Sequence, residues 1–239
     1  MKRLVYPLLV WLLVSTLVYA RTHHKPGKTL RIAVIDTGLD LNDPRLSNHL
    51  CRTGHKDFTG EGLVDLNGHG THIAGLIEKY AGEGNYCLVI YKYFATGDKA
   101  KYNARHEVDA IAEAVKNHVD VVNISSGGPE FVKREYDLIR FHPRTTFVLA
   151  AGNEGHDLDR DCNYYPACYL LGNEKIVGNV TETGAMVTSS NYGNVLSAVE
   201  VGDNVLSTAP NGGMTHSTGT SQATAIRTGK LIKEMLDAK

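Results

Sequence analysis

The sequence lacks an excess of charge of either sign, has one tryptophan and four cysteines, and contains no internal repeat or low-complexity segment. Its 239 residues carry 25 basic and 26 acidic side chains, a formal net charge of −1. This balance disfavours nucleic acid as a main partner, because phosphate binding needs a concentrated basic surface. With 42% hydrophobic residues, the chain is neither disordered nor a small disulfide scaffold. What remains is one globular domain, long enough to bury a sizeable core.

One long apolar run is present, and it lies at the N-terminus. Residues 4–19 are largely apolar, follow two basic residues and precede the small Ala20, and residues 1–20 contain no acidic side chain. This pattern predicts a secretory signal peptide that is cleaved after Ala20. An uncleaved anchor is the alternative, but 16 residues interrupted by Pro7 fall short of the roughly 20 that span a bilayer. We therefore expect residues 21–239 to form one secreted or periplasmic domain without a stable membrane span.

The even number of cysteines fits export to an oxidising compartment. Four cysteines allow three different pairings. Cys162 and Cys168 would close the shortest loop, which costs the least chain entropy, so we expect this pair first. The spacing contains no C-x-x-C element, and a structural zinc site is therefore not expected.

Apolar segments alternate with helical patterns along the rest of the chain. Near-continuous apolar runs predict buried parallel strands at residues 30–35, 87–93, 119–124 and 146–151. Residues 107–118 and the stretch after His69 place apolar side chains at helical spacing. Strands that alternate with helices imply an α/β fold, with a parallel sheet covered on both faces. Active sites in such sheets lie at the carboxyl ends of the strands, so the residues that follow each strand are the candidates.

Asp36 ends the first predicted strand in the motif Asp-Thr-Gly. A carboxylate followed by a glycine at a strand end is often only a turn, so the signal is weak by itself. Asp-Thr-Gly is also typical of aspartic proteases, in which two such aspartates share a proton. The chain has one Asp-Thr-Gly, so this interpretation would need two subunits.

His69 lies between two glycines immediately before a helical pattern. Small neighbours leave the imidazole accessible, although a single histidine at this place can also be a helix cap. A zinc site formed by His69 and His72 is a further alternative. It is disfavoured because no glutamate follows the first histidine, as it does in H-E-x-x-H.

Ser221 and Asn153 also have two interpretations each. Ser221 opens the last apolar helical pattern, where a serine is usually a cap but can be a nucleophile facing the positive end of the helix. Asn153 follows the strand at residues 146–151. It is either part of a polar turn or an amide donor to the oxyanion of an acyl-transfer intermediate.

Together, four motifs resemble, in order, those of the subtilisin family of serine proteases. They are Asp-Thr-Gly, His-Gly-Thr-His-x-Ala-Gly, Ala-Ala-Gly-Asn-x-Gly and Gly-Thr-Ser-x-Ala, and the match runs from about residue 30 to residue 239. The resemblance implies a three-layer α/β fold with a central, mostly parallel sheet. It also implies that Ser221 attacks the peptide carbonyl, His69 transfers the proton and Asp36 orients the imidazole. Asn153 and the Ser221 N–H would hold the oxyanion.

The resemblance also implies where the substrate binds. The segment after the third predicted strand looks like the family's edge segment, which binds the substrate as an added β-strand. Two groups of residues would then line the pocket for the residue before the scissile bond: Ser125, Ser126 and Gly127 on one side, and Ala151 and Gly152 on the other.

Two further expectations depend on the same resemblance. Neighbouring strands in the family would bring Cys51 and Cys87 together as a second disulfide. Asp159, Asp161 and Glu130 lie near segments that shape the first pocket and leave a preference for basic residues open, although acidic loop residues are usually solvated.

Three features depart from the family pattern. Members usually carry a long pro-region, but 15 residues separate Ala20 from Asp36, so we expect a compact member without a pro-domain. It would fold unaided or with a separate folding or inhibitory partner. Only 18 residues follow Ser221, which implies reduced packing on that face. The family's calcium site uses an aspartate in the stretch His-Pro-Asp-Leu, where this chain has Asp43-Pro44-Arg45-Leu46. The cation of Arg45 would repel calcium, and we expect no metal and no cofactor.

The resulting prediction is an exported endopeptidase that acts on polypeptide substrates. A protease-like binding protein that keeps the motifs without turnover is the main alternative. An activated-serine probe separates the two, because only an activated serine reacts. An aspartic protease built on Asp36 would ignore that probe and would be active as a dimer at acid pH.

Overall fold

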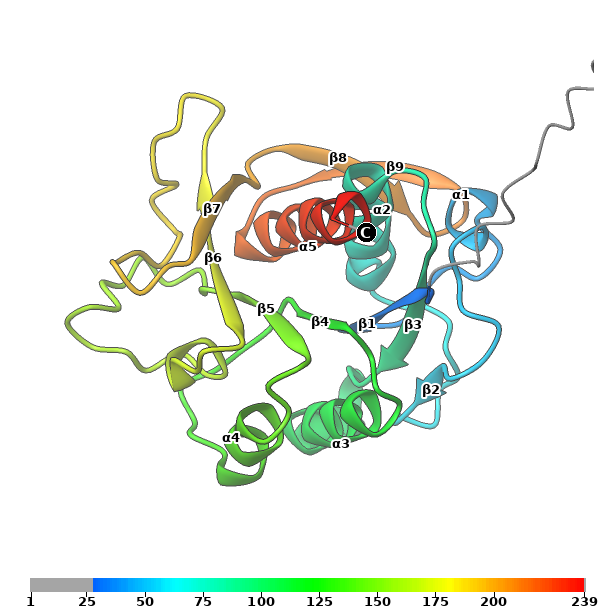
Figure 1. Ribbon diagram of the computed structural model, residues 1–239, viewed down its shortest axis with the longest axis horizontal. Helices are drawn as coiled ribbons and strands as arrows, with labels where there is room; N and C mark the ends of the chain where they lie inside the picture. Colours follow the sequence, from blue (N-terminus) through cyan, green and yellow to red (C-terminus); the bar gives the residue numbers. More distant parts are fainter. Residues whose placement is uncertain (1–27, 239) are drawn as a thin grey trace, which may run out of the picture.

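The computed structural model describes residues 28–238, so the predicted signal peptide at residues 1–20 lies outside the described residues. A seven-stranded parallel sheet forms the centre, in the order β2-β3-β1-β4-β5-β6-β7 (Figure 1). Its strands are β1 (Leu30–Asp36), β2 (Lys56–Asp57), β3 (Tyr86–Lys92), β4 (Val121–Ile124), β5 (Thr146–Ala150), β6 (Glu174–Val180) and β7 (Ala198–Val201). The four strands predicted from apolar runs are present, each within two residues of its expected ends.

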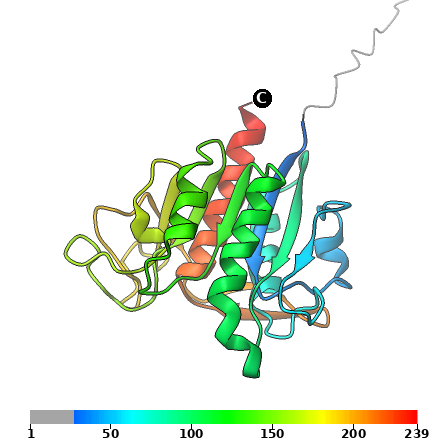
Figure 2. The same ribbon diagram turned by 90° about the horizontal axis from the view of Figure 1, so that it is seen from below.

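Helices cover both faces of the sheet, which confirms the predicted three-layer α/β fold. One face carries α2 (His69–Ala81) and α5 (Thr220–Asp237), and the other carries α3 (Asn103–Lys116) and α4 (Lys133–Arg140) (Figure 1). Figure 2 shows the molecule from the side that α3 and α4 cover. The remaining elements are α1 (Pro44–Ser47), two 3₁₀ turns at Gly97–Tyr102 and Ala167–Tyr169, and the antiparallel hairpin of β8 (Val205–Ala209) and β9 (Gly213–Ser217).

Two hydrophobic clusters, one on each face of the sheet, form the core. Along β1, Ile32 and Val34 belong to the cluster shared with α2 and α5. Ala33 and Ile35 belong to the cluster shared with α3 and α4. Successive strand residues point to opposite faces, and both faces are covered, so the strand reads as a continuous apolar run. None of the helices within residues 28–238 has both the length and the apolar character needed to cross a membrane.

Both expected disulfides are present. Cys162 is bonded to Cys168, and Cys51, between α1 and β2, is bonded to Cys87 in β3. The first pair closes a short loop after β5. This loop matters for the site, because it lies against the segment that follows β4.

Candidate active site

Asp36 and His69 are joined by a hydrogen bond at the carboxyl end of β1. His69 Nδ1 lies 2.8 Å from Asp36 Oδ1, and the Asp36 side chain is buried. Because a carboxylate only accepts hydrogen bonds, Nδ1 donates and Nε2 is left to act as a base. Burial alone would lower the pKa of His69, but the charge and hydrogen bond of Asp36 outweigh it and raise the pKa above 6.5. The imidazole is therefore oriented, and its cationic form is stabilised.

Two glycines allow α2 to approach β1 closely enough for this contact. A Cβ atom at Gly70 would lie 2.3 Å from the Gly38 carbonyl oxygen and 3.2 Å from Asp36 Oδ1. Gly38 has a φ of +115°, which side-chain-bearing residues rarely adopt. A larger residue at position 70 would push α2 away from Asp36, and one at position 38 would strain the turn and come within 2.5 Å of the Leu63 carbonyl oxygen. The absence of a side chain at these two positions is therefore needed for the packing around Asp36 and His69.

Ser221 is the second residue of α5 and is buried beside the segment after β4. Its hydroxyl donates a hydrogen bond to the Ser125 carbonyl oxygen at 2.9 Å, and Ser125 Oγ donates to the Ser221 carbonyl oxygen at 3.2 Å. Within residues 28–238, the Ser221 hydroxyl has no hydrogen bond to His69. Both residues nevertheless lie in the first turns of helices that pack against each other, α2 and α5. Rotation about the Ser221 χ1 bond moves the hydroxyl between staggered positions.

The side chain of Asn153 is oriented by the start of the same helix. Its Oδ1 atom accepts hydrogen bonds from the Thr220 backbone N–H at 2.9 Å and from the Thr220 hydroxyl at 3.1 Å. These two donors identify the oxygen of the amide, so the Nδ2 group remains as a donor on the other side. The Ser221 N–H has no acceptor among the described residues, as expected for the first turn of a helix. Two hydrogen-bond donors therefore lie at the positive end of α5.

The segment after β4 has one free edge suited to an added strand. The N–H and C=O groups of Gly128 both pair with Tyr165, at 2.9 and 2.7 Å. Backbone groups of successive residues in an extended chain point to opposite sides, so those of Gly127 face away from Tyr165. Neither group of Gly127 has a backbone partner within the described part of the chain. An extended peptide could pair there.

The Tyr164 ring fills the space in which the first substrate pocket was expected. A Cβ atom on Gly127 would lie 2.5 Å from Tyr164 Cε1, and one on Gly152 would lie 2.9 Å from Tyr164 Cδ2. The ring therefore lies between these two glycines. Ser126 points elsewhere, because its hydroxyl donates to Glu107 at 2.6 Å. Burial and nearby carboxylates raise the pKa of the Tyr164 hydroxyl, so this side chain is neutral at ordinary pH.

The sequence matches the profile of the subtilase family over residues 27–233. That range is most of the chain and includes Asp36, His69, Asn153 and Ser221. The chain belongs to the subtilase family. As a subtilase it is a serine endopeptidase, and its substrates are polypeptides.

Individual relatives agree with the family match. The chain is 34% identical over 222 residues to the major intracellular serine protease of Bacillus subtilis (strain 168), covering 86% of this chain and 68% of that relative. It is 32% identical over 231 residues to the intracellular serine protease of Paenibacillus polymyxa, covering 89% and 69%. Among solved structures, a cold adapted subtilisin-like serine proteinase superposes with a TM-score of 0.74 at 25% identity, covering 87% of this chain and 76% of that one.

Asp65 has a structural role beside the site of this subtilase that the sequence did not indicate. Its buried carboxylate accepts hydrogen bonds from the Thr37 hydroxyl, from the Asn67 and Gly68 N–H groups, and from both the N–H and the hydroxyl of Thr71. Burial alone would raise the pKa of Asp65, but these hydrogen bonds outweigh it and lower the pKa. Asp65 thus ties the loop before α2 to the loop after β1. An aspartate between Val64 and Leu66 carries no pattern that predicts this role.

His72, considered above for zinc, and Asp43, in the family's calcium-binding stretch, have other partners in this subtilase. The Nε2 atom of His72 is 3.2 Å from the carbonyl oxygens of both Val205 and Thr215, so His72 fastens the β8–β9 hairpin to α2. The guanidinium of Arg45 donates hydrogen bonds to both carboxylate oxygens of Asp43, which lowers the pKa of Asp43. Arg45 thus takes up the Asp43 oxygens that a cation would need.

Proposed function

We propose that Asp36, His69 and Ser221 form the catalytic triad, and that Asn153 and the Ser221 N–H form the oxyanion hole. The observation that carries the proposal is the 2.8 Å hydrogen bond between His69 Nδ1 and Asp36, which leaves Nε2 free as the base. Rotation of the Ser221 hydroxyl from Ser125 to Nε2 precedes attack. The Ser221 oxygen then bonds to the peptide carbonyl carbon, and its proton passes to His69.

The same residues complete the reaction. Collapse of the tetrahedral intermediate breaks the peptide C–N bond, and His69 returns the proton to the leaving amine. Water then attacks the acyl-enzyme, with His69 again as the base, and releases Ser221. Negative charge on the carbonyl oxygen is stabilised in each step by the Asn153 amide and the Ser221 N–H, at the positive end of α5.

Replacing Asn153 with alanine tests the oxyanion hole. We expect kcat to fall by about 10²–10³ with KM nearly unchanged, because the donor acts on charge that exists only in the transition state. Steady-state hydrolysis of a fluorogenic peptide measures both constants. Asn42→Ala, a change in an exposed loop, is the control and should leave kcat unaltered. A KM effect alone for the Asn153 variant would assign this side chain to substrate binding instead.

We propose that Ser125, Gly127, Ala151 and Gly152 bind the substrate beside the bond to be cut, with Ser126 contributing backbone only. Tyr164 then limits the residue before the bond to a small one. The support is the position of its ring between the two glycines, held by the loop that Cys162–Cys168 closes. The wild type should therefore cleave after alanine in preference to phenylalanine.

The Tyr164→Gly variant should reverse this preference. Removing the ring creates a pocket, and we expect the ratio of kcat/KM for phenylalanine over alanine at this position to rise by about 10–100-fold. Tyr164→Phe keeps the ring and is the matched control, with no change in the ratio. Equal cleavage of both peptides by the wild type would show that Tyr164 does not restrict the site.

Export is also part of the proposal. We infer that residues 1–20 are a signal peptide and that residues 21–239 form the peptidase domain, active in a secreted or periplasmic setting. Two disulfides support this location, because they persist in oxidising compartments.

A further inference from the structure

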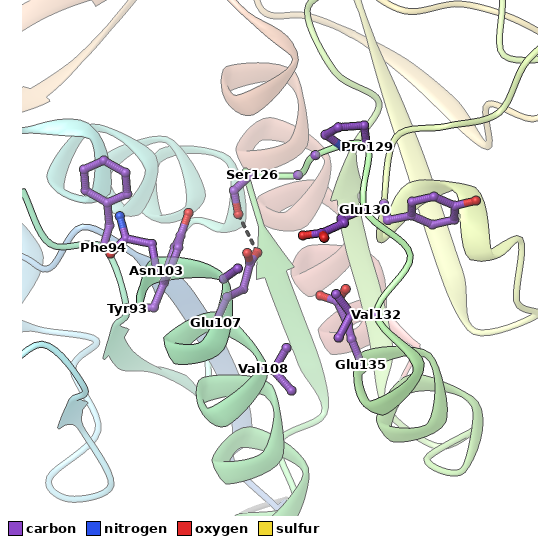
Figure 3. A pocket seen from close by; sticks show the side chains of 14 residues that line it. Tyr93, Phe94, Asn103, Glu107, Val108, Ser126, Pro129, Glu130, Val132 and Glu135 are labelled. Atoms are coloured by element: carbon purple, nitrogen blue, oxygen red, sulfur yellow. Dashed lines mark hydrogen bonds between the residues drawn. The ribbon is translucent and has the colours of Figure 1, made fainter. Parts of the chain in front are cut away.

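A second cavity, of about 270 Å³, lies beside the same substrate-binding segment (Figure 3). One wall is the segment Gly127–Glu130, and the others come from α3, α4 and the residues after β3. Apolar and aromatic side chains line much of it: Tyr93, Phe94, Val108, Pro129, Val132 and Tyr165. Tyr165 also pairs with Gly128, so the cavity adjoins the backbone edge that Gly127 presents.

Three carboxylates face this cavity, and none has a cationic partner within residues 28–238. They belong to Glu107 of α3, Glu135 of α4 and Glu130 of the segment between β4 and α4, and Figure 3 shows them turned toward a common space. Glu107 accepts one hydrogen bond, from the Ser126 hydroxyl at 2.6 Å. Lysine and arginine side chains pair with other carboxylates on the surface, but not with these three.

Glu135 is the least exposed of the three, with 5% of its surface accessible. Its Oε2 atom accepts a hydrogen bond from the Tyr169 hydroxyl at 2.7 Å, while Oε1 has no hydrogen-bond partner in the described part of the chain. Keeping a carboxylate charged is costly at a site with so little contact with water, and Oε1 is left to accept a hydrogen bond from a ligand in the cavity that Glu135 lines. A carboxylate that persists in such a place is suited to a cation delivered by a ligand.

The electrostatics of the cavity agree with this geometry. Burial, together with the charge of Glu135, raises the pKa of Glu107 to about 8, and burial also raises the pKa of Glu135. The raised pKa values mean that the two groups do not readily carry charge together, and a cation placed between them would stabilise both in the ionised form. The preferred cation has an apolar stem, because the cavity walls are aromatic and aliphatic.

We propose that this cavity binds an arginine or lysine side chain of the substrate, two to four residues before the scissile bond, with Glu107 and Glu135 holding its cationic group. The inference rests on the proposed function, since it assumes that the peptide pairs with Gly127. The apolar stem lies against Tyr93 and Val132, and the charged end reaches the carboxylates. A guanidinium can bind the two carboxylates together, so arginine is preferred over lysine. Glu130, considered above for the first pocket, contributes here instead.

Kinetics with matched peptides test the proposal. Each peptide has alanine before the scissile bond, and arginine or its neutral isostere citrulline at one of the second to fourth positions before the bond. We expect the kcat/KM ratio of the arginine peptide over the citrulline peptide to reach about 10–100 at one position. This is the effect expected when hydrogen bonds between charged groups are lost from a partly buried site. A ratio near one at every position overturns the proposal.

Variants then assign the effect to the cavity. In Glu107→Gln/Glu135→Gln the ratio should fall below about 3, because the amides keep the shape and the hydrogen bonds of Ser126 and Tyr169 but lose the charge. Glu113→Gln, on α3 outside the cavity, should leave the ratio as in the wild type. A ratio that survives the double change overturns the assignment, and circular dichroism confirms that each variant is folded.

Binding separates this proposal from the catalytic one. Fluorescence anisotropy with Ser221→Ala measures the affinity ratio of the arginine and citrulline peptides without hydrolysis. A ratio of one with Ser221→Ala inactive overturns the cavity proposal alone. A ratio of about 10–100 with undiminished hydrolysis by Ser221→Ala overturns the triad and leaves the cavity supported.

Discussion

Ser221→Ala is expected to lower kcat for peptide hydrolysis by about 10⁶-fold, the loss that follows removal of the nucleophile from such a triad. The hydroxyl oxygen is the atom that bonds to the substrate, and no neighbouring side chain can replace it. The fold should be retained, because the hydroxyl makes one hydrogen bond, to the Ser125 carbonyl oxygen. Loss of that bond costs about 1 kcal/mol of unfolding free energy.

The measurement is hydrolysis of a fluorogenic peptide at saturating concentration, with thermal unfolding as the check on folding. Ser189→Ala, in an exposed loop, is the matched control and should retain full kcat. Activity of the Ser221 variant within tenfold of the wild type would refute the proposed nucleophile. If Ser221→Ala loses both its activity and its fold, Ser221→Cys replaces it as the test, because cysteine keeps the volume of the side chain and this variant should fold.

Asp36→Asn is expected to lower kcat by about 10⁴-fold. Asp36 Oδ1 accepts hydrogen bonds from both His69 Nδ1 and the Thr37 N–H, and the amide oxygen can keep these contacts. What the variant removes is the negative charge that stabilises the imidazolium formed when His69 takes the proton. The decrease in kcat therefore measures that stabilisation.

The pH profile of the same variant gives an independent check. Peptide cleavage needs neutral His69, so the rate of the wild type rises with pH through the pKa of His69, which Asp36 holds above 6.5. Without the charge the pKa of His69 falls, and the rising limb moves to lower pH. A limb that moves upward or does not move, or a kcat within tenfold of the wild type, would exclude this role for Asp36.

The strands and helices near the site were predictable because local patterns determine them. The strands β1, β3, β4 and β5 are buried on both faces, so each is a continuous apolar run. The helices α2 and α5 begin at the family motifs that contain His69 and Ser221. β6 and β7 lack such runs, since the polar residues Asn179 and Glu200 are buried within them. The short helix α4 has a mostly charged sequence and depends on packing of Ile139 for its position.

Substrate contacts were less predictable, because they depend on residues distant in sequence. Tyr164 reaches the space between Gly127 and Gly152 only through the pairing of its loop with the segment after β4. Glu107 and Glu135 come from separate helices, and nothing in either helix indicates that they face one cavity. The motifs thus pointed to the candidate catalytic residues, while the pockets required the tertiary structure.

The proposed triad of Asp36, His69 and Ser221 explains the serine endopeptidase activity of this subtilase. The Asp36–His69 hydrogen bond favours a working enzyme, because it leaves a basic nitrogen available to activate a serine.

Labelling of the folded chain with a fluorophosphonate probe, followed by peptide mapping, tests this most directly. The triad predicts one labelled residue, Ser221, with labelling lost in Ser221→Ala and strongly slowed in His69→Ala. An unlabelled folded wild type, or a probe attached to another residue, would contradict it.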